Sequence, residues 1–171
     1  MTLVVVSGLP GVGKSTLAAA LADEWQAVHL SIDEVEDALL GCGLPADERT
    51  GIAAYEAVRA AAEQNLVLGR TVVVDAVNDS EPARETWRRA ARATGRPLQF
   101  VLLTLADRVE QRRRLARRRR GLAHLPEPAW AHVEQVAAVY AAWTADDVLR
   151  VDAAAGPSDV LKQVLRGLAC R

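Results

Sequence analysis

Eight residues near the start of the chain, Gly8–Ser15, constrain the fold more than any other segment. Their sequence, GLPGVGKS, matches the pattern G-x-x-x-x-G-K-[ST] at every fixed position. An apolar run at residues 3–6 precedes them, and a helix-forming run at residues 17–21 follows. Glycines let the backbone turn its N–H groups inward around an anion, and the helix that follows adds the positive end of its dipole. The segment therefore predicts a strand, a phosphate-binding loop and a helix, in that order.

The same pattern predicts a bound nucleoside triphosphate. Lys14 is expected to contact the β- and γ-phosphates, and the Ser15 hydroxyl is a candidate ligand of Mg²⁺. The expected cofactors are ATP and Mg²⁺, and the candidate nucleotide-binding residues are Gly8, Pro10, Gly11, Val12, Gly13, Lys14, Ser15 and Thr16. The alternative is a glycine-rich turn with a chance Lys-Ser pair, but the flanking strand and helix patterns favour the phosphate loop.

Short apolar runs and helical patterns alternate along the rest of the chain. Runs rich in β-branched residues predict five strands, at residues 3–7, 28–32, 71–75, 98–105 and 148–152. Helical patterns predict seven helices, at residues 15–26, 33–40, 46–69, 81–94, 108–120, 129–142 and 157–168. This alternation is typical of βαβ units, so we expect a three-layer α/β fold with a five-stranded parallel sheet and helices on both faces. Ligands of such folds bind at the carboxyl ends of the strands.

Composition narrows the class of protein. The 171 residues are half hydrophobic and one quarter charged, with a formal net charge of −1, which argues against a nucleic-acid-binding surface over the whole protein. No apolar run approaches the roughly 20 residues that span a bilayer. Cys42 and Cys170 have no metal-ligand spacing. We expect a cytoplasmic protein, a monomer or homodimer, with no membrane partner.

Two carboxylates stand at predicted strand ends. Asp33 follows the second strand, where a kinase needs a carboxylate to orient an acceptor hydroxyl and accept its proton; the alternative is a helix N-cap. Asp75 ends a run of three valines, an arrangement in which the carboxylate reaches Mg²⁺ or its water. The alternative for Asp75 is that it opens the turn at residues 75–78. We favour a site role for both.

Residues 112–120 contain seven arginines in nine positions. Helical spacing predicts Arg114 and Arg118 on one face of a helix. Such a run can be a solvated basic face, a nucleic-acid contact, or arginines that close over ATP and stabilise charge on the transferred phosphoryl group. For Arg114 and Arg118 we favour contact with ATP.

Other side chains have weaker claims to a site. Arg84, early in the helix after Asp75, could pair with that carboxylate, contact substrate or lie on the surface. Trp130 could form the floor of a substrate pocket, although aromatic residues in such helices more often pack in the core. No role is assigned to the three histidines, which have no metal-ligand spacing.

These residues together resemble a known family. The segments 8–16, 31–33, 72–78 followed by Arg84, and 114–118 are similar, in order, to the small P-loop kinases of the AAA_33 type. That group includes polynucleotide 5′-kinases, chloramphenicol phosphotransferase, zeta toxins and gluconate kinases. The resemblance covers roughly the first 120 residues. It implies a P-loop NTPase fold in a single domain, 1–171, with an Arg-rich lid at about residues 112–128. It also implies that Asp33 activates the acceptor hydroxyl and that Arg114 and Arg118 contact the nucleotide.

One position departs from the family pattern. Polynucleotide kinases of this group usually carry an arginine three residues after the aspartate that matches Asp33, and here Glu36 occupies that position. A carboxylate would repel a nucleic-acid phosphate. We therefore expect transfer of the γ-phosphate of ATP to a hydroxyl of a small, neutral or cationic acceptor, with Asp33, Glu36, Arg84 and Trp130 as candidate acceptor contacts. A polynucleotide 5′-hydroxyl kinase is the second hypothesis, and an ATP-binding switch without transfer activity is the third.

Overall fold

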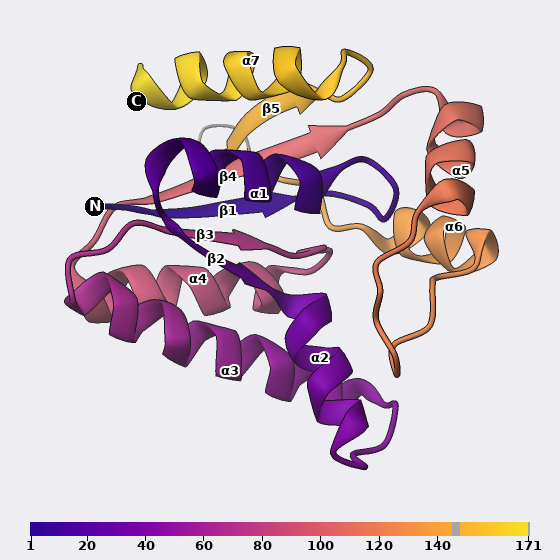
Figure 1. The fold of residues 1–171 in the computed structure, drawn as a ribbon, viewed down its shortest axis with the longest axis horizontal. Coiled ribbons are helices and arrows are strands. Elements are labelled where there is room, and N and C mark those ends of the chain that lie inside the picture. The colour runs from indigo at the N-terminus through magenta and orange to yellow at the C-terminus, as the bar shows by residue number, and fades with distance from the viewer. Residues whose placement is uncertain (145–147, 171) are drawn as a thin grey trace.

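The computed structural model of the chain describes residues 1–144 and 148–170, and a five-stranded sheet lies at its centre (Figure 1). The strands are β1 (Leu3–Ser7), β2 (Val28–Ser31), β3 (Val72–Asp75), β4 (Leu98–Thr104) and β5 (Val148–Asp152). All neighbouring strands pair in parallel, in the order β2-β3-β1-β4-β5. The predicted parallel sheet of five strands is confirmed.

Helices cover both faces of this sheet. On one face lie α1 (Lys14–Trp25) and α7 (Pro157–Ala169), and on the other α3 (Glu48–Val67) and α4 (Glu81–Thr94) (Figure 1). Three shorter helices lie toward the carboxyl ends of the strands: α2 (Ile32–Gly41), α5 (Arg108–Arg117) and α6 (Trp130–Val139). The phosphate loop and the polar strand ends therefore share one end of the molecule.

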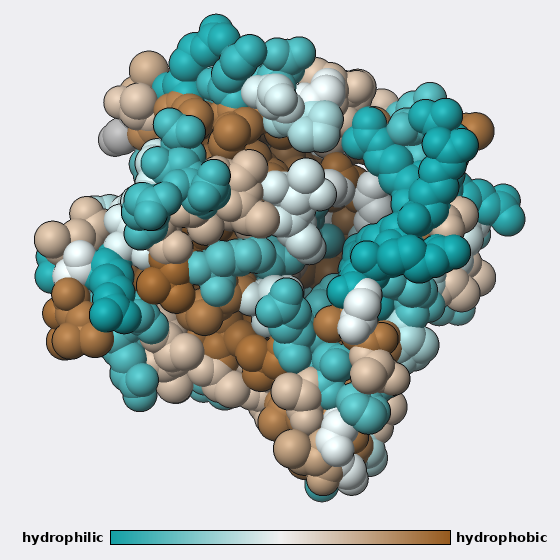
Figure 2. Space-filling model, viewed as in Figure 1, coloured by the Kyte–Doolittle hydropathy of each residue, from teal (hydrophilic) through white to brown (hydrophobic). Residues whose placement is uncertain are grey.

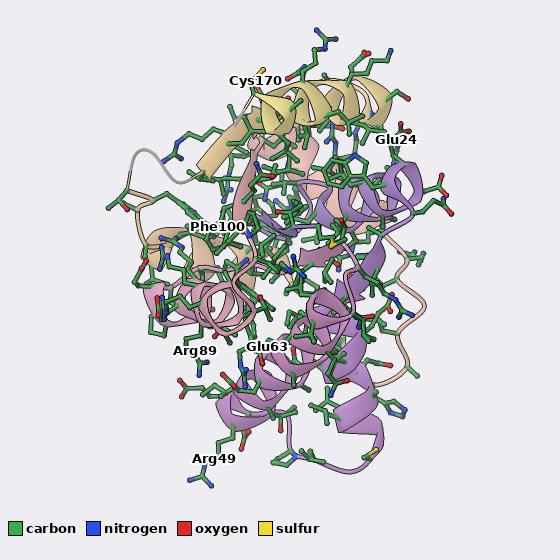
Figure 3. All side chains as sticks on the ribbon, turned by 90° about the vertical axis from the view of Figure 1, so that its left-hand side faces the viewer. Glu24, Arg49, Glu63, Arg89, Phe100 and Cys170 are labelled. Carbon is green, nitrogen blue, oxygen red and sulfur yellow. The ribbon has the colours of Figure 1, made fainter. Side chains whose placement is uncertain are left out.

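The hydrophobic core consists of two layers separated by the sheet. Side chains of β1 alternate between them, so that Leu3 and Val5 pack with α3 and α4 while Val4 and Val6 pack with α1 and α7. Both faces of the central strand are buried, which explains why its sequence is a continuous apolar run. Figure 3 shows Cys170, directly after α7, and Glu63 of α3 on opposite sides of the sheet, with Phe100 between them.

Helix α4 has the predicted bounds, and the other six helices differ from the sequence-based prediction by one to three residues at one or both ends. Helix α5 ends at Arg117 rather than at residue 120, and α6 spans Trp130–Val139 rather than 129–142. Helix α2 spans Ile32–Gly41 rather than 33–40. A Cβ atom at Gly41 would lie 2.8 Å from the His124 ring, so the lack of a side chain there lets this ring pack close to α2.

Within the described parts of the chain, none of the helices combines the length and hydrophobicity needed to cross a bilayer. Cys42 and Cys170 are both exposed free thiols.

Candidate active site

The loop between β1 and α1 has the backbone geometry that its glycines predict. Gly8, Gly11 and Gly13 all have positive φ angles, of 140°, 87° and 106°. A Cβ atom on Gly8 would lie 2.5 Å from the carbonyl oxygen of Leu103, so the loop and β4 approach each other too closely for a side chain. The predicted order of strand, loop and helix is confirmed.

Lys14 begins α1 and is only 8% exposed. Its Nζ atom donates a hydrogen bond to the carbonyl oxygen of Leu9 at 3.2 Å. Burial lowers the pKa of Lys14 to about 8, although the carboxylates of Asp33 and Asp75 act in the opposite direction. A buried cation beside inward-turned backbone N–H groups fits an anionic ligand, because an anion would compensate the charge that burial desolvates.

The carboxylate of Asp75 connects the phosphate loop to the edge strand β2. Its Oδ2 accepts a hydrogen bond from Ser15 Oγ at 2.6 Å, and its Oδ1 accepts one from His29 Nε2 at 2.8 Å. Asp75 is 3% exposed. Burial alone would raise the pKa of Asp75, but the hydrogen bonds from His29 and Ser15 outweigh it and hold the pKa below its usual value. Asp75 therefore pairs with Ser15 and His29, and not with Arg84.

His29 was not recognised from the sequence, although a signal was present. Side chains at residues 28, 30 and 32 are apolar, while His29, Ser31 and Asp33 alternate with them. In a strand, such alternation places the polar residues on one face. The register pairs Ser31 with Asp75 and His29 with Val73, so His29 lies diagonally across from Asp75.

Asp33, in the first turn of α2, is held by two arginines from the segment after α5. Its Oδ2 accepts hydrogen bonds from Arg118 at 3.2 Å and from Arg120 at 2.6 Å. Glu127 also pairs with both arginines, at 3.6 Å and 3.1 Å. Burial and the neighbouring Arg120 lower the pKa of Arg118. Arg120 was not singled out by the sequence analysis, because the predicted helix ran through residue 120.

Arg114 and Arg118, predicted on one face of a helix, are joined by a helical hydrogen bond from the Arg118 N–H to the carbonyl oxygen of Arg114 at 3.0 Å. Helix α5 ends between them, and their side chains have different partners. Arg114 donates to Glu110 at 2.8 Å and to the carbonyl oxygen of Ala153, after β5, at 2.9 Å. Arg114 therefore connects α5 to the β5 side of the site, whereas Arg118 reaches α2.

These groups surround one cleft with a volume of about 780 Å³. Figure 2 shows the hydrophilic residues of α5, at the right of the view, beside this hollow. Ser15 and His29 line the cleft, with the buried Asp75 behind them. Most of the lining comes from four places, namely residues 11–17 of the phosphate loop and α1, Asp33 and Glu34 of α2, the arginines at 114 and 117–120, and residues 153–158 after β5. His29 and Ser31 of β2 and Leu103 of β4 also line the cleft.

Three predicted acceptor contacts do not line this cleft. Arg84 is 1% exposed and donates to the backbone oxygens of Asn78, Ala141 and Ala142, so it is a core residue that does not pair with Asp75. Trp130 is half-buried, with the guanidinium groups of Arg108 and Arg112 against its ring. Glu36 is half-buried near Asp33, and burial followed by the charge of Asp33 raises its pKa.

The oxygen atoms of Ser15 and Asp75 suit Mg²⁺. This ion takes hard oxygen ligands and is usually bound by one or two protein side chains together with substrate phosphates and water. A hydroxyl and a carboxylate 2.6 Å apart, beside a buried lysine, provide that set of groups next to the phosphate loop. The residues present therefore fit the ion that the phosphate-loop pattern implies.

Comparison with protein families assigns the chain to one family. Residues 3–141 match the family AAA_33, described as an AAA domain. The chain belongs to this family. No curated protein matched it in sequence.

Solved kinase structures share the fold of this AAA_33 protein. A sugar kinase from Janibacter sp. HTCC2649 has a TM-score of 0.75 at 19% identity, over 99% of this chain and 95% of that one. A gluconokinase from Sinorhizobium meliloti 1021 has a TM-score of 0.71 at 21% identity, over 98% and 91%. The APS kinase of Mycobacterium tuberculosis, solved with AMPPNP and APS, has a TM-score of 0.70 at 19% identity, over 98% and 97%. The fold is thus that of a P-loop kinase.

Proposed function

We propose that this protein is an ATP-dependent phosphotransferase that moves the γ-phosphate of ATP to a hydroxyl of a small-molecule acceptor. The observation that carries the proposal is the shared cleft. The phosphate loop, Asp33 and the arginines at the end of α5 all line it, so a donor phosphate and an acceptor hydroxyl can meet there. The similarity of the fold to sugar kinases, gluconokinases and APS kinases supports the same class of reaction.

Each group has a defined role in the proposed reaction. The backbone N–H groups of the loop and Lys14 bind the phosphates of ATP. Asp33 orients the acceptor hydroxyl and takes its proton as the hydroxyl oxygen bonds to the γ-phosphorus and the bond to the β-phosphate oxygen breaks. Arg114 and Arg118, with Arg120, are the candidates to neutralise charge on the transferred group.

Ser15 and Asp75 would hold Mg²⁺, which when bound neutralises phosphate charge and fixes the geometry of the nucleotide. His29 and Ser15 keep the Asp75 carboxylate in place before any ligand arrives. Asp33 is occupied by Arg118 and Arg120 in this structure, so these arginines must turn from the carboxylate before it can accept a proton.

The surroundings of Asp33 favour an acceptor without a negative charge. Glu36 forms no hydrogen bond or ion pair among the described residues, and it lies close enough to Asp33 and Arg120 for their charges to act on it. When Arg118 and Arg120 move to the phosphates, both carboxylates remain on the acceptor side. A neutral polyol or an amino alcohol suits such a site better than a sugar acid or a phosphate ester.

A panel of hydroxyl compounds tests the proposal. Neutral polyols, amino alcohols, sugar acids, nucleosides and 5′-hydroxyl oligonucleotides are each incubated with the protein and MgATP, and ADP release is measured. We expect acceptor-dependent ADP release with a small neutral or cationic compound, a phosphorylated product by mass spectrometry, and no release by Lys14→Met. ATP binding without acceptor-dependent ADP release for any compound would instead support a nucleotide-binding switch.

A polynucleotide 5′-kinase remains the second candidate, because two further arginines line the same cleft. Arg117 and Arg119 are exposed and form no ion pair with any described residue. If they hold a nucleic-acid backbone, oligonucleotide affinity falls steeply with salt. Binding that is absent, or that does not change with salt, eliminates this candidate.

A further inference from the structure

His29 lies between the cleft and the buried carboxylate of Asp75. Its ring forms part of the wall of the cleft, and its Nε2 lies 2.8 Å from Asp75 Oδ1. A carboxylate can only accept, so the ring nitrogen donates this hydrogen bond. Sequence patterns gave His29 no role, and its contact with Asp75 joins residues 46 positions apart.

The two oxygens of Asp75 have separate partners. Ser15, on the phosphate loop, donates to Oδ2, and His29, on β2, donates to Oδ1. A carboxylate with one partner can rotate about its last bond, whereas two donors on different elements fix its plane. Asp75 is 3% exposed, so water offers little replacement if either donor is lost.

The fixed carboxylate in turn orients the Ser15 hydroxyl. Because the Ser15 proton is directed to Asp75, the lone pairs of its oxygen are left for another partner, and Ser15 itself lines the cleft. Hydrogen bonds to the groups around a metal commonly set the orientation of its ligands. His29 occupies that position for the Ser15–Asp75 pair.

We propose that His29 is a positioning residue for the magnesium–nucleotide site, acting through its hydrogen bond to Asp75. The inference rests on the proposed function, since it concerns the ion that accompanies ATP. It adds a residue that neither the phosphate-loop pattern nor the family resemblance identified. The role of His29 depends on the hydrogen bond that it donates to Asp75. Another side chain that places an N–H donor at the same position should therefore replace it.

Four variants separate positioning from packing. His29→Leu removes the donor at similar volume, and His29→Gln places an amide N–H at nearly the same distance from the backbone. His29→Asn keeps the amide on a shorter side chain. His132→Leu, at an exposed histidine of α6, is the matched control. The probe is AMPPNP, measured by calorimetry in Mg²⁺ and again in EDTA, with thermal melting to check folding.

We expect the His29→Leu substitution to lower the affinity for AMPPNP only when Mg²⁺ is present. Affinity for AMPPNP in Mg²⁺ falls about 10–100-fold in His29→Leu, the usual effect of removing such a hydrogen bond. His29→Gln recovers most of it, His29→Asn does not, and His132→Leu matches the wild type. In EDTA all the proteins bind AMPPNP alike. If His29→Leu does not fold, the difference in AMPPNP affinity between His29→Gln and His29→Asn tests the proposal.

Other outcomes overturn the inference. Equal affinities of wild type and His29→Leu in Mg²⁺, an equal loss in EDTA, or failure of Gln to do better than Asn would each show that the donor does not position the site. If the wild type binds AMPPNP no better with Mg²⁺ than without, the proposed function fails together with the inference. Normal Mg²⁺-dependent binding by every His29 variant leaves the proposed function intact and removes only the role of His29.

Discussion

Lys14 is the residue at which ligand binding and folding stability oppose each other. Burial disfavours its charged form, and in the protein without ligand its only hydrogen bond within the described chain goes to the carbonyl oxygen of Leu9. A bound phosphate would compensate this charge. The protein therefore holds, at some cost in stability, a cation that an anionic ligand needs.

This opposition predicts a pH-dependent stability. The folded pKa of about 8 lies below the ordinary value of 10.5, so between these values the unfolded chain binds more protons. The contribution of Lys14 to the free energy of unfolding therefore rises with pH from about 8 to 10.5 and is constant below that window. Lys14→Met should remove this rise and stabilise the ligand-free protein at pH 7 by up to about 3 kcal/mol.

Urea unfolding of wild type and Lys14→Met at pH 7 and pH 10 measures the difference. A gap between the two proteins that does not narrow as pH rises contradicts a buried, charged Lys14.

Arg84 is a buried cation that, unlike Lys14, contributes to folding stability. It carries three hydrogen bonds to backbone oxygens and lies 3.9 Å from the centre of the Trp143 ring. Arg84→Met leaves these oxygens without their donor and should lower the free energy of unfolding by about 3 kcal/mol. Urea denaturation measures the loss, and Arg88→Met, at a less buried arginine of the same helix, is the control. Equal effects of the two substitutions would be inconsistent with a core role.

At the scale of elements, hydrogen bonds hold residues 118–129, the segment between α5 and α6, against α2. Besides the Asp33 contacts, Asp37 Oδ1 accepts hydrogen bonds from the backbone N–H groups of His124 and Leu125, both at 2.7 Å. Gly41 lets the His124 ring pack directly against α2. Arg120 and Glu127 join the two ends of the segment. These contacts set where Arg118 and Arg120 lie relative to the cleft.

Removing the Asp37 contact should loosen this segment without touching the phosphate loop. Asp37→Ala deletes the acceptor of two backbone N–H groups, so we expect trypsin to cut after Arg119 or Arg120 several times faster than in wild type. Asp23→Ala, at an exposed carboxylate of α1, is the control. Unchanged cleavage in Asp37→Ala would mean that the segment is held by other contacts.

The end of helix α5 could not be predicted from the sequence. The helical pattern continued through the arginine run, and residues 108–120 contain no glycine or proline, so nothing local indicated an end at Arg117. Beyond the end of the helix, Arg118 and Arg120 donate hydrogen bonds to Asp33, across 85 and 87 residues. Side-chain partners so distant in sequence leave no periodic signal.

At the scale of the whole molecule, the alternation of strands and helices was sufficient to predict the parallel sheet, because each short apolar run must be buried on both faces. The phosphate loop could be predicted for a local reason, since its glycines and Lys14 act within eight residues. The placement of Asp33 and Asp75 at one end followed from the parallel topology. The strand order, the His29–Asp75 bond and the burial of Arg84 depend on packing between distant segments, which one sequence does not display.

The central claim is that one cleft transfers a phosphoryl group to a hydroxyl held by Asp33. Asp33→Asn keeps the size of the side chain and removes its ability to take a proton. The most direct measurement is turnover of MgATP with the best acceptor, beside the affinity for AMPPNP, in wild type and Asp33→Asn. We predict that turnover falls about 10²–10⁴-fold while AMPPNP affinity stays close to that of wild type. Near-normal turnover in Asp33→Asn would contradict the account.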